Sequence, residues 1–167
     1  MTCDPIDEIL VQWQKERPDL DMSPMGILGI TPRLAKYINR EIGETVAKFG
    51  LNPGEFDVLT ALRRSGKPYQ LSPTELYNSM MVSSGTMTHR IDGLERVELV
   101  ERIPAPSDRR SALIHLTEKG FNLVEKAVEA HVKNGHRILS VLNTSELETL
   151  NTLLSKLLVS LALSRST

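Results

Sequence analysis

The 167-residue sequence has a single cysteine, Cys3, so no disulfide can form within the chain and a disulfide-stabilised scaffold is excluded. It has no apolar run of the ~18 residues that a membrane-spanning helix needs. No signal peptide is evident either. These absences predict a cytoplasmic protein with no membrane partner.

The motifs of the common enzyme chemistries are also missing. There is no glycine-rich phosphate loop, no nucleophile elbow and no His-Glu metal motif. His115, His131 and His136 have no cysteine or carboxylate cluster at metal-ligand spacing, so we interpret them as surface or core histidines. We therefore expect no enzymatic activity and no metal or cofactor.

The composition is that of an ordinary globular chain, 40% hydrophobic and 25% charged, which predicts one domain over residues 1–167 with a sizeable core. The net charge is −1, whereas nucleic-acid binders are often basic. Basic residues are nevertheless concentrated in one segment. Arg102, Arg109, Arg110 and His115 lie there with Asp108, which suggests a local site for phosphate contacts.

Apolar spacing and capping residues divide the chain into predicted elements. Helices are expected at 4–16, from Thr31 to Gly50, from Asn52 to before Gly66, from Thr117 to about Leu142, and after Asn143. Between them, a short helix capped by Ser72 is expected to include Met80, and residues 83–85 are expected to open another that includes Leu94. Strands are expected at 99–103 and 111–116. The segment 17–29 contains Pro18, Pro24, Gly26 and Gly29 and is predicted to be a connection. The last helix carries leucines three and four residues apart, a heptad-like seam with more apolar surface than a small monomer leaves uncovered.

From Ser72 to Gly120 these elements follow the order helix, turn, helix, two strands with a basic tip, helix. This order is typical of a winged helix-turn-helix, which places one helix in the DNA major groove and a β-hairpin beside it. The predicted fold class is therefore mainly α with a small β-hairpin wing.

Short polar side chains at the start of the second helix of this motif would let its backbone approach the bases, and helix N-terminal N–H groups favour phosphate. An ordinary solvated helix face is the alternative. The candidate DNA contacts on this helix are Ser83, Ser84, Thr86, Thr88, His89 and Arg90.

The tip of the predicted hairpin supplies three more candidates. Arg109 and Arg110 are placed to enter a minor groove, and Asp108 would orient an arginine through a charge-assisted hydrogen bond. An exposed turn with an incidental charge pair is the alternative interpretation.

The segment MVSSGTMTHRIDGLERVELVERIPAPSDRRSALIHLTEKG resembles the core of the MarR family of transcriptional regulators. It contains the wing signature Asp108-x-Arg110 and the helix start Leu116-Thr117-x-x-Gly120. The resemblance implies a homodimer, in most cases a repressor, that binds a pseudo-palindromic double-stranded DNA operator. It also implies that residues 4–50 and 117–163 mainly dimerise and that 51–116 form the DNA-binding region.

Asp57 lies in an apolar stretch, where an unpaired carboxylate is costly to bury. Arg64, seven residues further on the same helix face, and Arg90 are its candidate partners. A purely structural ion pair is one interpretation.

A sharper interpretation rests on resemblance to the urate-responsive subgroup of the family, whose residue set is matched here by Trp13, Asp57, Arg64 and Arg90. It implies that Trp13 and Arg64 hold an anionic purine and that Asp57 pairs with Arg90. Plain core packing of Trp13 remains open, as do a phenolic effector, no effector, or an activator role. Redox sensing by Cys3 is a further alternative, although no cationic residue precedes it to lower its pKa.

Overall fold

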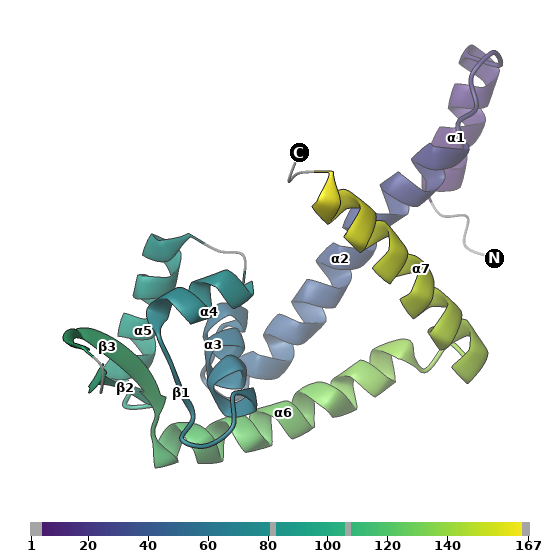
Figure 1. Cartoon of the computed structure of the whole chain (residues 1–167). Coiled ribbons are helices and arrows are strands. Elements are labelled where there is room, and N and C mark those ends of the chain that lie inside the picture. The colour runs from purple at the N-terminus through teal and green to yellow at the C-terminus, as the bar shows by residue number, and fades with distance from the viewer. Residues whose placement is uncertain (1–4, 81–82, 106–107, 165–167) are drawn as a thin grey trace.

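The computed structural model describes residues 5–80, 83–105 and 108–164. It is mainly helical, with a small antiparallel sheet in the order β1-β3-β2 (Figure 1). Along the chain the elements are α1 (Pro5–Glu16), α2 (Ser23–Ala47), α3 (Pro53–Arg64), β1 (Gln70–Leu71), α4 (Pro73–Met80), α5 (Ser84–Arg96), β2 (Val100–Ala105), β3 (Asp108–Leu116), α6 (Glu118–Leu139) and α7 (Thr144–Leu163).

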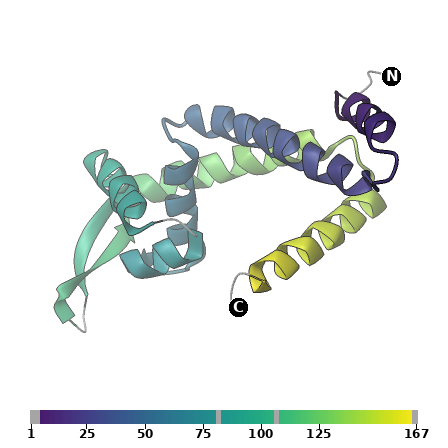
Figure 2. The same cartoon turned by 90° about the horizontal axis from the view of Figure 1, so that it is seen from above.

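The elements form a compact lobe and an extended helical part. Helices α3, α4 and α5, the sheet and the start of α6 make up the lobe, from which α2 and α6 lead away toward α1 and α7 (Figures 1 and 2). The core lies in the lobe: Leu59, Leu62, Leu76, Leu94 and Ile114 are fully buried there. This is the predicted winged helix-turn-helix class.

The predicted connection over 17–29 is confirmed at residues 17–22. It is wrong from Ser23 onward, where α2 begins, so the predicted helix start near Thr31 is also wrong. The two glycines that suggested a break are contact points with α1. A Cβ on Gly29 would lie 3.3 Å from Ile6 Cδ1, and one on Gly26 would lie 3.3 Å from Leu10 Cδ1. Close packing of two helices therefore explains glycines that pattern reasoning assigned to a loop.

The predicted helix starts at the lobe are confirmed by their caps. Asn52 and Glu55 form a reciprocal capping box at α3, with Glu55 N donating to Asn52 Oδ1 at 2.9 Å. Thr117 Oγ1 accepts a hydrogen bond from Gly120 N at 3.0 Å and so caps α6. These local bonds satisfy helix N–H groups that would otherwise lack a partner.

The wing is longer than predicted. Strand β2 runs to Ala105 and β3 starts at Asp108, with Arg102 opposite Ile114 and Val100 opposite Leu116. Most of the predicted basic tip thus belongs to paired strands. The two-residue strand β1, which was not predicted, adds to the far edge of β3.

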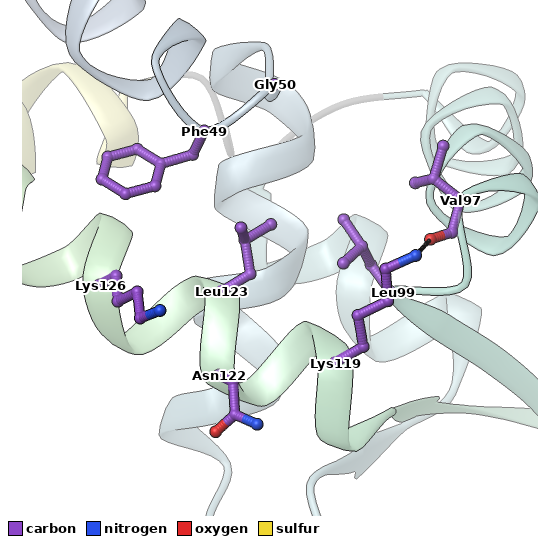
Figure 3. A pocket seen from close by; sticks show the side chains of 8 residues that line it. All are labelled: Phe49, Gly50, Val97, Leu99, Lys119, Asn122, Leu123 and Lys126. Atoms are coloured by element: carbon purple, nitrogen blue, oxygen red, sulfur yellow. Dashed lines mark hydrogen bonds between the residues drawn. The ribbon is translucent and has the colours of Figure 1, made fainter.

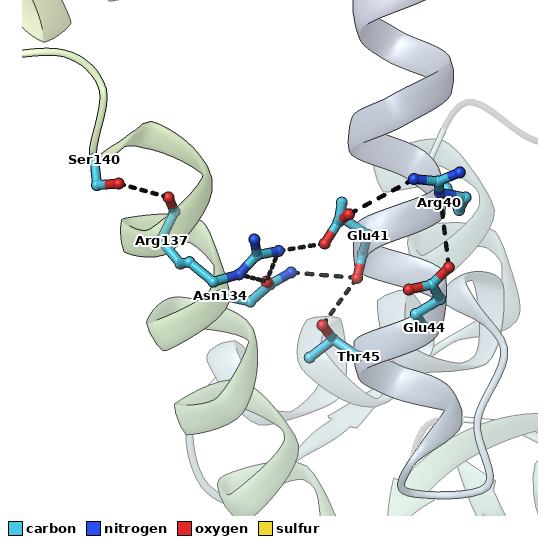
Figure 4. Close-up of polar contacts among 7 residues, drawn as sticks. All are labelled: Arg40, Glu41, Glu44, Thr45, Asn134, Arg137 and Ser140. Atoms are coloured by element: carbon cyan, nitrogen blue, oxygen red, sulfur yellow. Dashed lines mark hydrogen bonds and ion pairs between the residues drawn. The ribbon is translucent and has the colours of Figure 1, made fainter.

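Polar contacts fasten α2 to α6 beyond the lobe (Figure 4). Arg137 pairs with the Glu41 carboxylate, and Asn134 Nδ2 donates to the Glu41 carbonyl at 3.2 Å. Thr45 Oγ1 donates to the same carbonyl at 2.8 Å. The two long helices are held side by side by a charged pair and a shared acceptor.

Helix α7 has no buried residue. Its leucines from Leu153 onward are half to two-thirds exposed, from 51% at Leu154 to 67% at Leu163. α2 likewise exposes Ile27, Leu28 and Leu34. Such a large apolar surface marks an interaction site. Within the described ranges, no helix is long and apolar enough to cross a membrane.

Candidate nucleic-acid interface and ligand cavity

Helix α5 presents its first turns to solvent. Ser83, Ser84, Thr86, Thr88 and His89 are all exposed. Ser83 Oγ accepts a hydrogen bond from Thr86 N at 3.2 Å and therefore caps the helix. The predicted contact residues thus share one exposed helix start, where free N–H groups and short side chains meet.

Arg90 differs from the other predicted contact residues because it is half-buried and directed at α3. A Cβ on Gly54 would lie 2.4 Å from Arg90 Nε, so the guanidinium rests directly against the first turn of α3. Its Nη1 lies 3.9 Å from Met80 Sδ. Arg90 therefore links the recognition helix to the α3 helix that carries Asp57.

Asp108, Arg109 and Arg110 open strand β3 at the tip of the wing. Their side chains lie outside the described residues, as do all of Cys3 and its surroundings. Their assignment as contacts therefore stays a prediction, made from sequence and from the position of the backbone.

The interpretation of Arg102 as a free basic residue of the wing is wrong. Its guanidinium pairs with Asp92 at 2.5 Å and with Glu95, both on α5, and its backbone N–H donates to Glu95 Oε1 at 3.2 Å. The hydrogen bond to Asp92 is the main reason that the pKa of Arg102 is raised. Likewise, His115 Nδ1 lies 2.9 Å from Glu101 Oε1. We refer to the contacts of Arg102 with Asp92 and Glu95 as the wing clamp.

A cavity of about 650 Å³ opens between α3 and α6, and Asp57 and Arg64 both line it as their spacing predicted. We call it the Asp57 cavity. Burial raises the pKa of the Asp57 carboxyl, while the positive charges of Arg90 and Arg64 act in the opposite direction. No hydrogen bond or ion pair joins Asp57 to either arginine within the described part of the chain, so the expected direct pair is not formed.

Two groups that sequence reasoning missed complete the walls of the Asp57 cavity. Arg63 Nε pairs with Glu125 Oε1 at 2.6 Å across α3 and α6. The His131 ring lies against Phe56 at an angle of 47°, with ring centroids 5.2 Å apart, and its buried Nδ1 has no hydrogen-bond partner among the described residues. An unpartnered ring nitrogen at a cavity wall is a group that a ligand can satisfy.

Trp13 is not part of this cavity in a single chain. It is 44% exposed on α1, which packs on the far end of α2 from α3 (Figure 1). Of the four predicted effector residues, the structure thus brings together Asp57, Arg64 and Arg90 and leaves Trp13 apart.

We expect Asp57→Asn to raise the melting temperature at neutral pH, on the order of 2 °C. The pKa of Asp57 is raised above 3.8, so protonation stabilises the fold. The stabilisation by the protonated Asp57 carboxyl is fully present below pH 3.8 and is lost as the pH rises through the raised pKa. The difference in melting temperature between Asp57→Asn and the wild type, measured by circular dichroism, should therefore vanish near pH 4.

Asp21→Asn is the control for this substitution, because hydrogen bonds from Ser23 lower the pKa of Asp21. A melting temperature of Asp57→Asn below that of the wild type at neutral pH would contradict the prediction.

Comparison with known proteins shows the family to which this chain belongs. The MarR family model matches residues 51–112. The HTH-type transcriptional regulator PecS of Dickeya dadantii is 40% identical over 151 residues, which cover 90% of this chain and 91% of PecS. The chain belongs to the MarR family. It is therefore a winged helix-turn-helix transcriptional regulator that binds DNA, similar to PecS, and it is not an enzyme.

Solved structures of MarR-family proteins agree. A mutant of E. coli MarR complexed with operator DNA superposes with a TM-score of 0.71 at 25% identity, covering 93% of this chain and 99% of that one. Bordetella bronchiseptica BpsR, whose DNA binding is regulated by 6-hydroxynicotinic acid, gives a TM-score of 0.69 at 26% identity, covering 77% and 90% of the two chains.

Proposed function

We propose that this MarR-family protein is a homodimeric repressor that is released from a pseudo-palindromic operator when a small aromatic anion, such as urate or another purine, enters the Asp57 cavity. The observation that carries the proposal is the position of Asp57. It lines a ligand-sized cavity and is influenced by Arg90, which belongs to the recognition helix. Similarity to PecS and to BpsR, which 6-hydroxynicotinic acid regulates, supports ligand control.

The coupling follows from charge. An anion beside Arg64 is attracted by that arginine and repels the neighbouring carboxylate of Asp57. Any displacement of Asp57 alters the field at Arg90, which is packed against Gly54 at the start of α3. A coupling free energy of about 1.4 kcal/mol changes operator affinity tenfold, within the usual range for allosteric proteins.

Dimerisation is part of the proposal. Residues 4–50 and 117–163 contain the exposed apolar surface of α2 and α7, which a second copy would cover. A role for Trp13 in effector binding requires that second copy, because α1 lies far from α3 within one chain (Figure 1).

The effector is tested by titrating urate against the protein bound to its own upstream DNA, with fluorescence anisotropy as the measurement. We expect at least about tenfold weaker operator binding and a higher melting temperature of the free protein. Arg64→Ala should keep operator affinity and lose both responses. If urate changes neither quantity, the purine version is wrong; 6-hydroxynicotinic acid then tests the aromatic-acid alternative. If no ligand acts, an effector-blind regulator remains.

The DNA contacts are tested by separate substitutions. We expect Arg110→Ala to weaken binding to all sequences and to reduce the salt slope by about one, as the loss of a phosphate contact does. Thr86→Ala and His89→Ala should instead change preference among operator variants, at about 1–3 kcal/mol per altered base contact. Lys133→Ala, on α6, is the control for net charge. Unchanged binding in all three test variants would contradict these assignments.

A further inference from the structure

The Asp57 cavity contains a second pair of opposite charges that the proposed function leaves unused. Arg63 and Glu125 line it beside Asp57 and the neighbouring arginine, so its wall carries two guanidinium groups and two carboxylates. Arg63 Nε donates to Glu125 Oε1 at 2.6 Å, from α3 to α6. Neither terminal amino group of Arg63 has a hydrogen-bond partner in the described part of the chain. Arg63 therefore keeps donors that an anion in the cavity can use.

Glu125 holds the charge of Arg63 in check. A guanidinium whose Nε lies 2.6 Å from a carboxylate oxygen is largely compensated, so an anion gains little from Arg63 while the pair is closed. The hydrogen bond to Glu125 is also the main reason that the pKa of Arg63 is raised. The two side chains are 36% and 45% exposed. Because a solvated ion pair of this kind is weak, a ligand can separate it.

The guanidinium of Arg63 also packs on two aromatic rings. Its Cζ lies 5.3 Å from the ring centroid of Tyr69 and 4.8 Å from that of Phe121. Both distances are those of cation–π contacts. The two rings lie against each other as well, with centroids 5.3 Å apart. Any movement of the guanidinium toward a ligand therefore changes the packing of both rings.

These two rings belong to segments that hold the wing in place. The Tyr69 carbonyl accepts a hydrogen bond from Leu116 N, at the end of β3, at 3.1 Å. Phe121 is in the first turn of α6. In the same turn, Lys119 Nζ donates to the carbonyl of Val97, the residue that follows the recognition helix, at 2.8 Å (Figure 3). One ring thus leads to the wing sheet, and the other leads to the end of the recognition helix.

We propose that an anionic effector in the Asp57 cavity recruits Arg63 from Glu125, so that Glu125 sets the affinity for the effector and Arg63 transmits its binding to the wing. This inference rests on the proposed function and adds a second route to it, since the first runs through Asp57 to Arg90. Arg63 and Arg64 are consecutive on α3 and both line the cavity. Two neighbouring guanidinium groups suit an anion with acceptor atoms on more than one edge, as the ring carbonyls of urate are arranged.

Isothermal titration calorimetry of the full-length protein with urate tests the competition. Glu125→Gln keeps an oxygen acceptor for Arg63 Nε and removes the opposing charge, so we expect about three- to fivefold tighter binding. Arg63→Gln should weaken binding by about the same factor or more, because the Glu125 carboxylate then stays unpaired in the wall. Glu129→Gln is the charge control and should bind as wild type does, since Glu129 is exposed one turn further along α6 and does not line the cavity.

NMR signals test the transmission to the wing. At saturating urate the Nε–H signal of Arg63 should move as its hydrogen bond to Glu125 opens, and the backbone amide signal of Leu116 should shift. In Arg63→Gln at saturation the shift at Leu116 should be lost. The shift at Thr60, which lines the cavity, should remain. A purely structural ion pair would give neither the movement at Arg63 nor its consequence at Leu116.

Three results would each overturn the proposal: urate affinity in Glu125→Gln that does not exceed that of the wild type, an Arg63 Nε–H signal that stays in place at saturation, or a Leu116 shift that survives in Arg63→Gln. Each of them leaves the proposed function intact if urate still binds and releases the operator. Absence of urate binding in both the wild type and Glu125→Gln would overturn this proposal together with the purine version of the proposed function.

Discussion

Replacing Gly120 with alanine should lower the melting temperature by roughly 6–12 °C. A Cβ at this position would lie 2.0 Å from the Leu99 carbonyl oxygen and 2.9 Å from Leu116 Cδ1. The first of these is a backbone atom, so no side-chain rotation can relieve the clash. The start of α6 must instead move away from the wing, at about 3 kcal/mol or somewhat more for an overpacked site of this kind.

Gly135→Ala is the matched control for this substitution, because the residue is on the same helix and nothing lies within 4 Å of its added Cβ. Alanine is the better helix former by roughly 0.5–1 kcal/mol, so Gly135→Ala should leave the melting temperature unchanged or raise it. Thermal unfolding followed by circular dichroism measures both. Equal melting temperatures for Gly120→Ala and wild type would show that α6 is not in contact with the turn at Leu99.

Leu157→Glu should convert a dimer into a monomer and weaken operator binding at least about 100-fold. Leu157 belongs to the α7 leucine seam and is 53% exposed in the single chain. If a second copy covers it, the glutamate loses about 1.5–3 kcal/mol of apolar burial and adds a charge that is costly to desolvate. A palindromic operator engages both DNA-binding regions at once, and losing one of them removes an avidity of about 10²–10⁴.

Light scattering after gel filtration distinguishes the outcomes directly. The wild type should have twice the 18.7 kDa chain mass, and Leu157→Glu should have the chain mass itself. Thr152→Glu is the control, because Thr152 lies on the helix face opposite the seam and its hydroxyl only bonds the Glu148 carbonyl, at 2.8 Å. If Leu157→Glu keeps the dimeric mass, the α7 seam does not form the interface.

Local signals in the sequence predicted the parts of the fold that local physics determines. The caps at Asn52 and Thr117 each act within four residues, and the predicted opening of the recognition helix at residues 83–85 agrees with a helix that begins at Ser84. The position of Asp57 and Arg64 on one helix face, where both line the same cavity, also follows from spacing alone. Each of these features depends on residues that are close in the chain.

The errors arose where a residue's partner is distant in sequence. Gly29 was predicted to break a helix, because its contact with Ile6 on another helix cannot be seen in the local sequence. Arg102 was predicted to be a basic residue available for DNA, because Asp92 and Glu95 approach it only after β2 folds back along α5. The unpartnered His131 nitrogen gave no signal at all, since it depends on three-dimensional packing around Phe56.

The wing clamp has a consequence for how operator titrations are interpreted. Its three side chains are one-third to one-half exposed, so dissolved ions screen the clamp as they screen contacts with DNA. Raising the ionic strength therefore releases counterions from phosphate and also loosens the wing from the recognition helix. A salt slope converted directly into a number of neutralised phosphates will then exceed the true number of phosphate contacts.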